Sequence, residues 1–191
     1  MKNSTKVIFG IIGAFVLVIV LIVGWGVSTY NGIVKAETEV EEKASTIQTQ
    51  LQRRSDLIPN LVETVKAYAS HEKEIFTEIA EARAKLNGAT TLEEQAEADA
   101  ELSSALSRLM VIVENYPELK ANQNFIGLQD QLENTENRIA VARKDYNEAV
   151  KEYNYRIRRF PSSIIASMFG FEKAKSFEGK SGIDNPPDVS F

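Results

Sequence analysis

The side chains that could do chemistry are few and scattered in this chain. His71 is the only histidine, and no cysteine is present. Without cysteine there can be no disulfide, no thiolate metal site and no thiol nucleophile. A di-iron site in a helical bundle needs paired Glu-x-x-His motifs, and no glutamate stands three residues before His71. The sequence therefore argues against the common metal centres of helical proteins.

The remaining polar groups also lack the partners that catalysis needs. Ser162 and Ser163 have no cysteine or histidine partner that would serve a nucleophilic mechanism. Most of the ten glycines lie in the N-terminal apolar run and the C-terminal tail, so a glycine-rich phosphate loop is missing. His71 and Glu72 are predicted to lie on the exposed polar face of a helix rather than to form an acid–base pair. We expect no enzyme activity and no cofactor.

Charged residues late in the sequence are spaced for ion pairing along one helix. Glu133 and Glu136 lie within one or two helical turns of Arg138 and Arg143. The plain interpretation is an intrahelical charge network, in which each pair contributes roughly 0.2–0.5 kcal/mol.

A long apolar run at the N-terminus predicts a membrane anchor. Residues 7–27 have the sequence VIFGIIGAFVLVIVLIVGWGV, without charge or proline. About 20 such residues cross the hydrocarbon core as a helix, and Trp25 and Tyr30 suit the interface at one end. The run is longer than the apolar part of a cleaved signal peptide, and no small-x-small site follows it. We expect a short N-terminal segment, residues 1–6, and then a single-pass anchor in the lipid bilayer of the cell membrane through residues 7–27.

The distribution of charge limits the partners of the chain. Lys2 and Lys6 precede the apolar run and Lys35 and Lys43 follow it, so the bias towards an inside N-terminus is slight and both orientations remain open. The whole chain carries 22 Lys and Arg against 27 Asp and Glu. This net negative charge argues against nucleic acid as a partner and against a generally basic lipid-binding surface.

Hydrophobic periodicity after the anchor predicts one helical domain, residues 28–171. Apolar residues recur at three-four spacing, and short turns would make successive helices antiparallel. The expected fold class is all-α, with an N-terminal transmembrane helix followed by a long antiparallel four-helix bundle. The turns are expected at 56–59, 87–91 and 117–121. Residues 172–191 are expected to form an irregular tail.

Capping residues set the expected helix ends. Asp56 would cap the second helix, with Pro59 in its first turn, where the missing N–H costs little. Asn87-Gly88 would end that helix as a left-handed cap, and Thr91 with Glu94 would form a capping box. The fourth helix, from about 122 to 160, is predicted to be the longest. Its sustained apolar stripe favours near-parallel packing against its neighbours, with Ile139 buried near the middle.

Several strings of the sequence closely resemble those of the bacterial LemA family. The strings are LQRRSDLIPNLV at 51–62, VKAY at 65–68, HE at 71–72, YPELKAN at 116–122, the stretch 133–141, YN at 146–147 and 153–154, and FP at 160–161. The resemblance covers nearly the whole chain, and Ser55 stands where the family usually has alanine. It implies an antiparallel helical bundle on a membrane anchor and supplies no catalytic residues. Family members are often encoded beside membrane metallopeptidases or other membrane-anchored domains, which implies a membrane protein partner.

Antiparallel helices would bring two of these strings together. The turns around 53–60 and 116–124 are expected to meet at the end of the bundle far from the membrane. The plain interpretation of both turns is capping and packing. The alternative is a docking patch, because arginine and tyrosine suit interface hot spots and charge pairing. The candidate docking residues are Arg53, Arg54, Asp56, Tyr116, Glu118 and Lys120.

The same geometry would return the end of the fourth helix to the membrane. Three arginines there precede the apolar segment 160–171. Bases at a helix C-terminus complement its dipole, but a basic cluster beside an apolar aromatic segment also suits lipid headgroups. Folding back to cover the base of the bundle remains an equal alternative for the segment. The candidate membrane-interface residues are Arg156, Arg158, Arg159, Phe169 and Phe171.

These expectations combine into one functional hypothesis. We expect a membrane-anchored helical-bundle protein that acts as an interaction or scaffold module, bound to a membrane protein or to a second copy of itself. The alternative is a membrane-anchored ligand-sensing or signalling bundle, which would need a polar-lined pocket among the helices.

Overall fold

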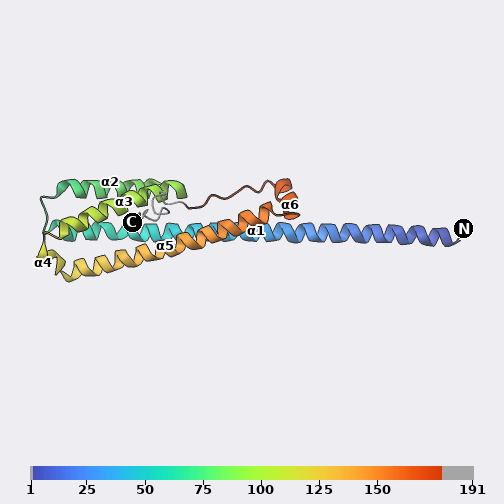
Figure 1. Cartoon of the computed structure of the whole chain (residues 1–191), viewed down its shortest axis with the longest axis horizontal. Coiled ribbons are helices and arrows are strands. Elements are labelled where there is room, and N and C mark those ends of the chain that lie inside the picture. Colours follow the sequence, from blue (N-terminus) through green and yellow to red (C-terminus); the bar gives the residue numbers. More distant parts are fainter. Residues whose placement is uncertain (1, 178–191) are drawn as a thin grey trace, which may run out of the picture. The chain divides into compact units, whose positions relative to one another are not determined.

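The structure, a computed structural model, describes residues 2–177 and the side chains of residues 10–177. In this part of the chain every regular element is a helix (Figure 1). The helices are α1 Lys2–Lys66, α2 Lys73–Gly88, α3 Leu92–Val113, α4 Pro117–Lys120, α5 Gln123–Arg158 and α6 Ser162–Phe169. The predicted all-α class, with a long apolar N-terminal helix followed by further helices, is confirmed.

The helices belong to two compact units. Unit 1 comprises α1 up to Glu41 together with the segment Glu148–Lys175. Unit 2 comprises Glu42–Asn147 and, within the described residues, Ser176 and Phe177. Helices α1 and α5 therefore contribute residues to both units.

The first part of α1 is a candidate membrane span. An 18-residue window of this helix has a mean hydropathy of 2.7, and none of that window is buried. Its large apolar side chains from Ile11 to Val27 are exposed. A helix that is apolar on all sides is stable in a hydrocarbon environment and unfavourable in water.

Pro59 lies inside α1, so the predicted turn at 56–59 is wrong. Proline has no N–H to donate to the carbonyl four residues earlier, which here belongs to Ser55. The Nε of Arg83 in α2 donates to that carbonyl oxygen at 2.9 Å. Because the freed acceptor is satisfied from the neighbouring helix, α1 can continue past the proline. The chain turns instead at 67–72.

The second predicted turn is present, but its geometry differs. No residue of Asn87-Gly88 has a positive φ, so the predicted left-handed cap is wrong. The capping box is confirmed. Thr91 Oγ accepts from the backbone N–H of Glu94 at 3.2 Å, and a Glu94 carboxylate oxygen accepts from the backbone N–H of Thr91 at 3.1 Å. Backbone N–H donors at Thr90 and Thr91 hold the pKa of Glu94 below its usual value.

Unit 2 is a set of helices packed around an apolar core. Helices α2 and α3 lie side by side and antiparallel (Figure 1). Lys85 and Glu101 form an ion pair at 2.6 Å between them, and Arg108 pairs with Glu78 at their other ends. The predicted burial of Ile139 is confirmed. Other fully buried side chains of this core are Ile47, Ile58, Leu61, Ile79, Leu102 and Leu109.

Unit 1 packs the end of α5 and α6 against α1. The ring of Tyr30 in α1 contacts Phe169 and Phe171, with centroid distances of 4.7 and 5.7 Å. Helix α6 ends at Gly170, whose φ of 75° lets the chain reverse direction without steric cost. The Tyr153 hydroxyl in α5 donates to the carbonyl of Glu172 at 2.9 Å, and burial raises the pKa of Tyr153.

The segment after α6 is irregular, as predicted, as far as it is described; 178–191 lies outside the described residues. In unit 1, the Asn154 amide donates to Ala174 O at 2.9 Å and accepts from Ala174 N–H at 3.0 Å. In unit 2, Asn147 makes the same pair of bonds with Phe177, at 3.2 and 2.8 Å. An amide side chain can satisfy both groups of one backbone residue. Two asparagines of α5 thus fix this segment without a regular element.

Candidate functional site

Buried charges tie three helices of unit 2 together. Arg54 Nη1 in α1 lies 2.7 Å from Asp99 Oδ1 in α3 and 2.6 Å from Glu136 Oε2 in α5. Arg143 Nη2 in α5 lies 2.5 Å from the second carboxylate oxygen of Asp99, which is only 1% exposed. Charge-assisted bonds of this kind are the strong ones in proteins. One buried carboxylate therefore joins α1, α3 and α5.

This network corrects two expectations from the sequence. Arg54 is 5% exposed and engaged in the core, so it is not available as a docking residue. Glu136 and Arg143 pair with other helices, so the predicted intrahelical network is wrong for them. A buried charge is tolerated when it is paired and hydrogen-bonded. The ion pairs therefore keep these side chains in place.

A signal for the network was present in the sequence. Arg54 falls at the apolar spacing of α1, three residues after Leu51 and four before Ile58. Asp99 falls on the stripe of α3, three residues before Leu102. A charged residue on the buried stripe of an amphipathic helix needs an opposite charge on a facing helix. The sequence alone does not say which helix supplies it.

The other docking candidates in α1, Arg53 and Asp56, are exposed. They lie within the helix and not at its end. Asp56 accepts a hydrogen bond from Gln52 at 2.8 Å. It precedes Lys66, the end of α1, by ten residues, which is about 15 Å along the axis. The string around 53–60 is therefore not a turn, and the expected meeting of two signature turns does not occur.

The turn 67–72 and α4 meet at one end of unit 2 instead; we call this region the α4 end. The Tyr116 hydroxyl donates to Glu72 Oε1 at 3.4 Å. Asn122 Nδ2 donates to the hydroxyl of Tyr68 at 3.0 Å. Tyr68 remains 37% exposed, and Tyr116 is half-buried. Both tyrosines are thus fixed by polar partners at the surface.

The charged residues of the α4 end are open to solvent. Glu118 and Lys120 are exposed, and Lys120 pairs with Glu114 at 2.6 Å. His71 is exposed in the turn rather than on a helix face, which corrects its predicted place. Of the six candidate docking residues, this end gathers Tyr116, Glu118 and Lys120.

The arginines at the end of α5 differ from one another in their contacts. Arg156 donates to Glu152 Oε1 at 2.8 Å and to the carbonyl of Gly32 in α1 at 3.2 Å. Arg158 and Arg159 are exposed, and neither has a carboxylate partner within residues 10–177. The guanidinium of Arg159 stacks over the ring of Tyr155 at 5.4 Å.

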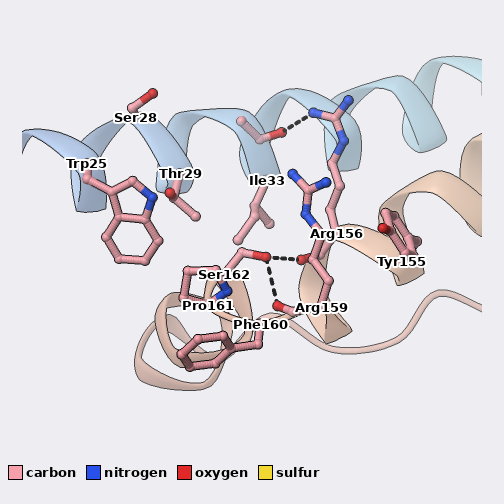
Figure 2. A pocket seen from close by; sticks show the side chains of 11 residues that line it. Trp25, Ser28, Thr29, Ile33, Tyr155, Arg156, Arg159, Phe160, Pro161 and Ser162 are labelled. Carbon is pink, nitrogen blue, oxygen red and sulfur yellow. Dashed lines mark hydrogen bonds between the residues drawn. The ribbon is translucent and has the colours of Figure 1, made fainter.

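A pocket of about 500 Å³ lies in unit 1 where two of these arginines face α1 (Figure 2). Trp25 and Thr29 contribute the α1 side of the pocket, and Arg156, Arg159 and Ser162 contribute the other. Ser162 Oγ donates to the backbone carbonyls of both arginines, at 2.6 and 3.0 Å. No spacing in the sequence links Trp25 and Thr29 to residues more than a hundred positions away.

The apolar segment beyond these arginines has two faces. Ser162 and Ala166 are buried, whereas Ile164 and Met168 are exposed. Phe171 is half-buried, and Phe169 contacts Tyr30 but stays 59% exposed. One face of α6 thus covers α1, as the second alternative predicts, and the other face is exposed; contact of that face with lipid stays a prediction. Phe160 is 82% exposed and does not extend the buried stripe of α5.

Comparison with known proteins identifies the family. The LemA family model matches residues 43–191. The chain belongs to the LemA family. Magnetosome proteins MamQ 1 and MamQ 2 of Paramagnetospirillum magneticum are each 28% identical to it, over 90% of this chain and 72% of theirs. Protein LemA of Metamycoplasma hominis is 22% identical, over 86% of this chain and 77% of its own.

The LemA match covers both the buried network and the α4 end, and it begins within α1, after the exposed apolar stretch from Ile11 to Val27. In the part of the chain that the structure describes, no cluster of three or more histidine, aspartate or glutamate side chains is placed to bind a metal ion. The arginine-lined pocket of unit 1 and the polar aromatic α4 end of unit 2 are two surface features of this LemA protein that gather candidate residues from the sequence.

Proposed function

We propose that this LemA protein is a membrane-anchored interaction module. Helix α1 holds it in the cell membrane, and the α4 end binds a partner protein. The observation that carries the proposal is the pair of surface tyrosines, Tyr68 and Tyr116, each fixed by a hydrogen bond beside exposed charges. Tyrosines held in place lose little entropy on binding and are common interface anchors.

The buried network supports this role. Arg54, Asp99 and Arg143 fix the mutual register of three helices, so the α4 end is a surface with a defined shape. A preorganised surface loses less free energy on association than a flexible one. The relatives point in the same direction, since the MamQ proteins are named for a cellular structure, the magnetosome, and not for a reaction.

The membrane attachment has two parts in this proposal. The exposed apolar stretch of α1 crosses the bilayer, and the open face of α6 lies in its interface with Phe169 and Phe171. Deleting residues 1–27 should release the protein from sedimented membranes. A truncated protein that remains fully bound would show that α6 and its arginines dominate attachment.

Site-specific photo-crosslinking in native membranes tests the docking end. A photoreactive residue replaces Glu118 in one full-length variant and the exposed Lys144 of α5 in the control. We expect a discrete adduct from position 118 alone, whose mass distinguishes a different membrane protein from a second copy of this chain. Tyr116→Ala should reduce the adduct, by about thirtyfold if Tyr116 is a hot spot. Equal labelling at both positions would contradict docking at the α4 end.

A second candidate function, a ligand-sensing bundle, is favoured by the polar-lined pocket of unit 1. This pocket supplies the feature that such a function requires. The arginines and hydroxyl groups that line it indicate which class of ligand it would bind.

A further inference from the structure

The pocket of unit 1 lies at the level where the membrane span ends. The apolar stretch of α1 ends with Trp25 and Val27, and hydroxyl side chains follow at Ser28 and Thr29. Tryptophan favours the headgroup region, where the apolar part of the ring contacts hydrocarbon and the indole N–H reaches water. Trp25 itself lines the pocket. With α1 in a bilayer, the pocket therefore opens among the lipid headgroups.

The pocket wall offers several donors and cationic groups. Figure 2 shows the side chains of Arg156, in α5, and of Arg159, just after it, reaching towards α1. The indole N–H of Trp25 and the hydroxyl of Thr29 belong to the same lining. Guanidinium groups match the geometry of phosphate oxygens and bind them through paired charge-assisted bonds.

The two arginines have different capacities for a ligand. Arg156 is already bonded to Glu152 and to the carbonyl of Gly32, which fixes its position in the wall. Arg159 has its stacking contact with Tyr155 and no carboxylate partner within residues 10–177. In unit 2 the buried Arg54 is neutralised by carboxylates. Arg159 is therefore the cation that remains available to an incoming anion.

We propose that this pocket binds a phosphate group, supplied by the headgroup of an anionic phospholipid. Arg159 makes the main ion pair, Arg156 contributes from its fixed position, and Trp25 lies beside the glycerol region. The position of the pocket at the end of the span favours a lipid over free phosphate. The inference rests on α1 as the anchor and is independent of docking at the α4 end.

Trp25 is the only tryptophan of the chain, so its fluorescence reports on the pocket directly. The full-length protein in a neutral detergent is titrated with dihexanoyl phosphatidylglycerol, with dihexanoyl phosphatidylcholine and with inorganic phosphate. The first lipid should give a saturable change in emission. The zwitterionic lipid, which has the same chains, should bind at least about tenfold more weakly, because it carries no net charge for the arginines.

Two arginines at the end of α5 provide a matched pair of variants. Arg159→Gln and Arg158→Gln each remove one exposed base, but only Arg159 lines the pocket. Arg159→Gln should weaken phosphatidylglycerol binding by roughly tenfold or more, the loss expected for a charge-assisted bond. Arg158→Gln should weaken it by at most about fivefold, the share of one base near the surface.

A third variant tests the pocket without a change in charge. A Cβ at Gly32 would meet only the Arg156 Nη1, at 4.0 Å, so Gly32→Ala can be accommodated and adds a methyl group to the pocket wall. It should reduce lipid binding while the melting temperature is kept. Equal losses in Arg158→Gln and Arg159→Gln, or no saturable change with either phosphate source, would overturn the proposal. Tighter binding of inorganic phosphate than of the lipid would overturn the lipid as the source.

Discussion

Arginines in α5 and directly after it lie in both compact units, and their surroundings differ. In unit 2, Arg143 reaches the nearly inaccessible carboxylate of Asp99, which also binds Arg54 from α1. In unit 1, Arg159 is exposed beside a pocket and stacks on Tyr155. The first pair of arginines is balanced by carboxylates within the core. The second site has an excess of positive charge.

This difference separates a structural arginine from one that can bind a ligand. A guanidinium that is paired with carboxylates inside a helical core holds helices together, and an added anion would gain little from it. A partly exposed guanidinium without a carboxylate keeps its donors for an incoming anion. The comparison therefore predicts a structural role for the arginines of unit 2 and, under the proposal above, a binding role for Arg159 in unit 1.

The largest expected effect comes from removing the shared carboxylate. Asp99→Asn keeps the shape of the side chain but leaves two guanidinium groups facing a neutral amide. We expect a loss of about 3–5 kcal/mol in the free energy of unfolding. Urea unfolding of the full chain in detergent, followed by circular dichroism, measures it. The exposed Asp130→Asn is the control, with a change within about 0.5 kcal/mol.

The second-largest effect on the free energy of unfolding is expected at the hydrogen bond between Arg83 and the carbonyl that Pro59 leaves without a backbone donor. Arg83→Met leaves the carbonyl of Ser55 without its partner, at a cost of about 1–3 kcal/mol. Adding Pro59→Ala supplies a backbone N–H four residues on, which should recover most of the loss. A double-mutant cycle with both changes gives the coupling. If Pro59→Ala fails to rescue, the bond is incidental to the continuity of α1.

A smaller effect is expected at the capping box of α3. Thr91→Ala should cost about 1 kcal/mol in unfolding free energy. Because the pKa of Glu94 is lower in the folded than in the unfolded chain, its contribution is present at neutral pH and is lost as pH falls through the folded-state value. Glu94→Gln should therefore flatten the acid limb of the stability curve. An unchanged acid limb would argue against the box.

The smallest stability effect is expected at Arg159, where the comparison predicts a large effect on binding. Because the side chain is exposed, Arg159→Gln should change the free energy of unfolding by less than about 0.5 kcal/mol. The same urea unfolding experiment measures this change, with Asp99→Asn run in parallel for comparison. A loss of several kcal/mol would mean that Arg159 is structural, and the contrast between the two units would disappear.

Local patterns in the sequence were sufficient for much of the fold. The apolar run, the capping box at Thr91 and the buried stripe around Ile139 depend on neighbours within a few turns, so their spacing predicts them. The predicted break in α1 at Pro59 is wrong, and it was predicted because proline is usually a helix boundary. The helix tolerates proline at position 59 because of Arg83, which comes 24 residues later in the chain and lies on another helix.

The sequence by itself determined the helical class, the candidate membrane span and most of the apolar residues that face the core, because each follows from hydrophobic periodicity or from the length of an apolar run. Only the tertiary structure decided which arginines are neutralised and which are available. Arg54 and Arg159 are the same residue type, yet one meets Asp99 and the other lines a pocket. The free energy of a charge depends on the groups placed around it, and those groups come from helices far apart in the sequence.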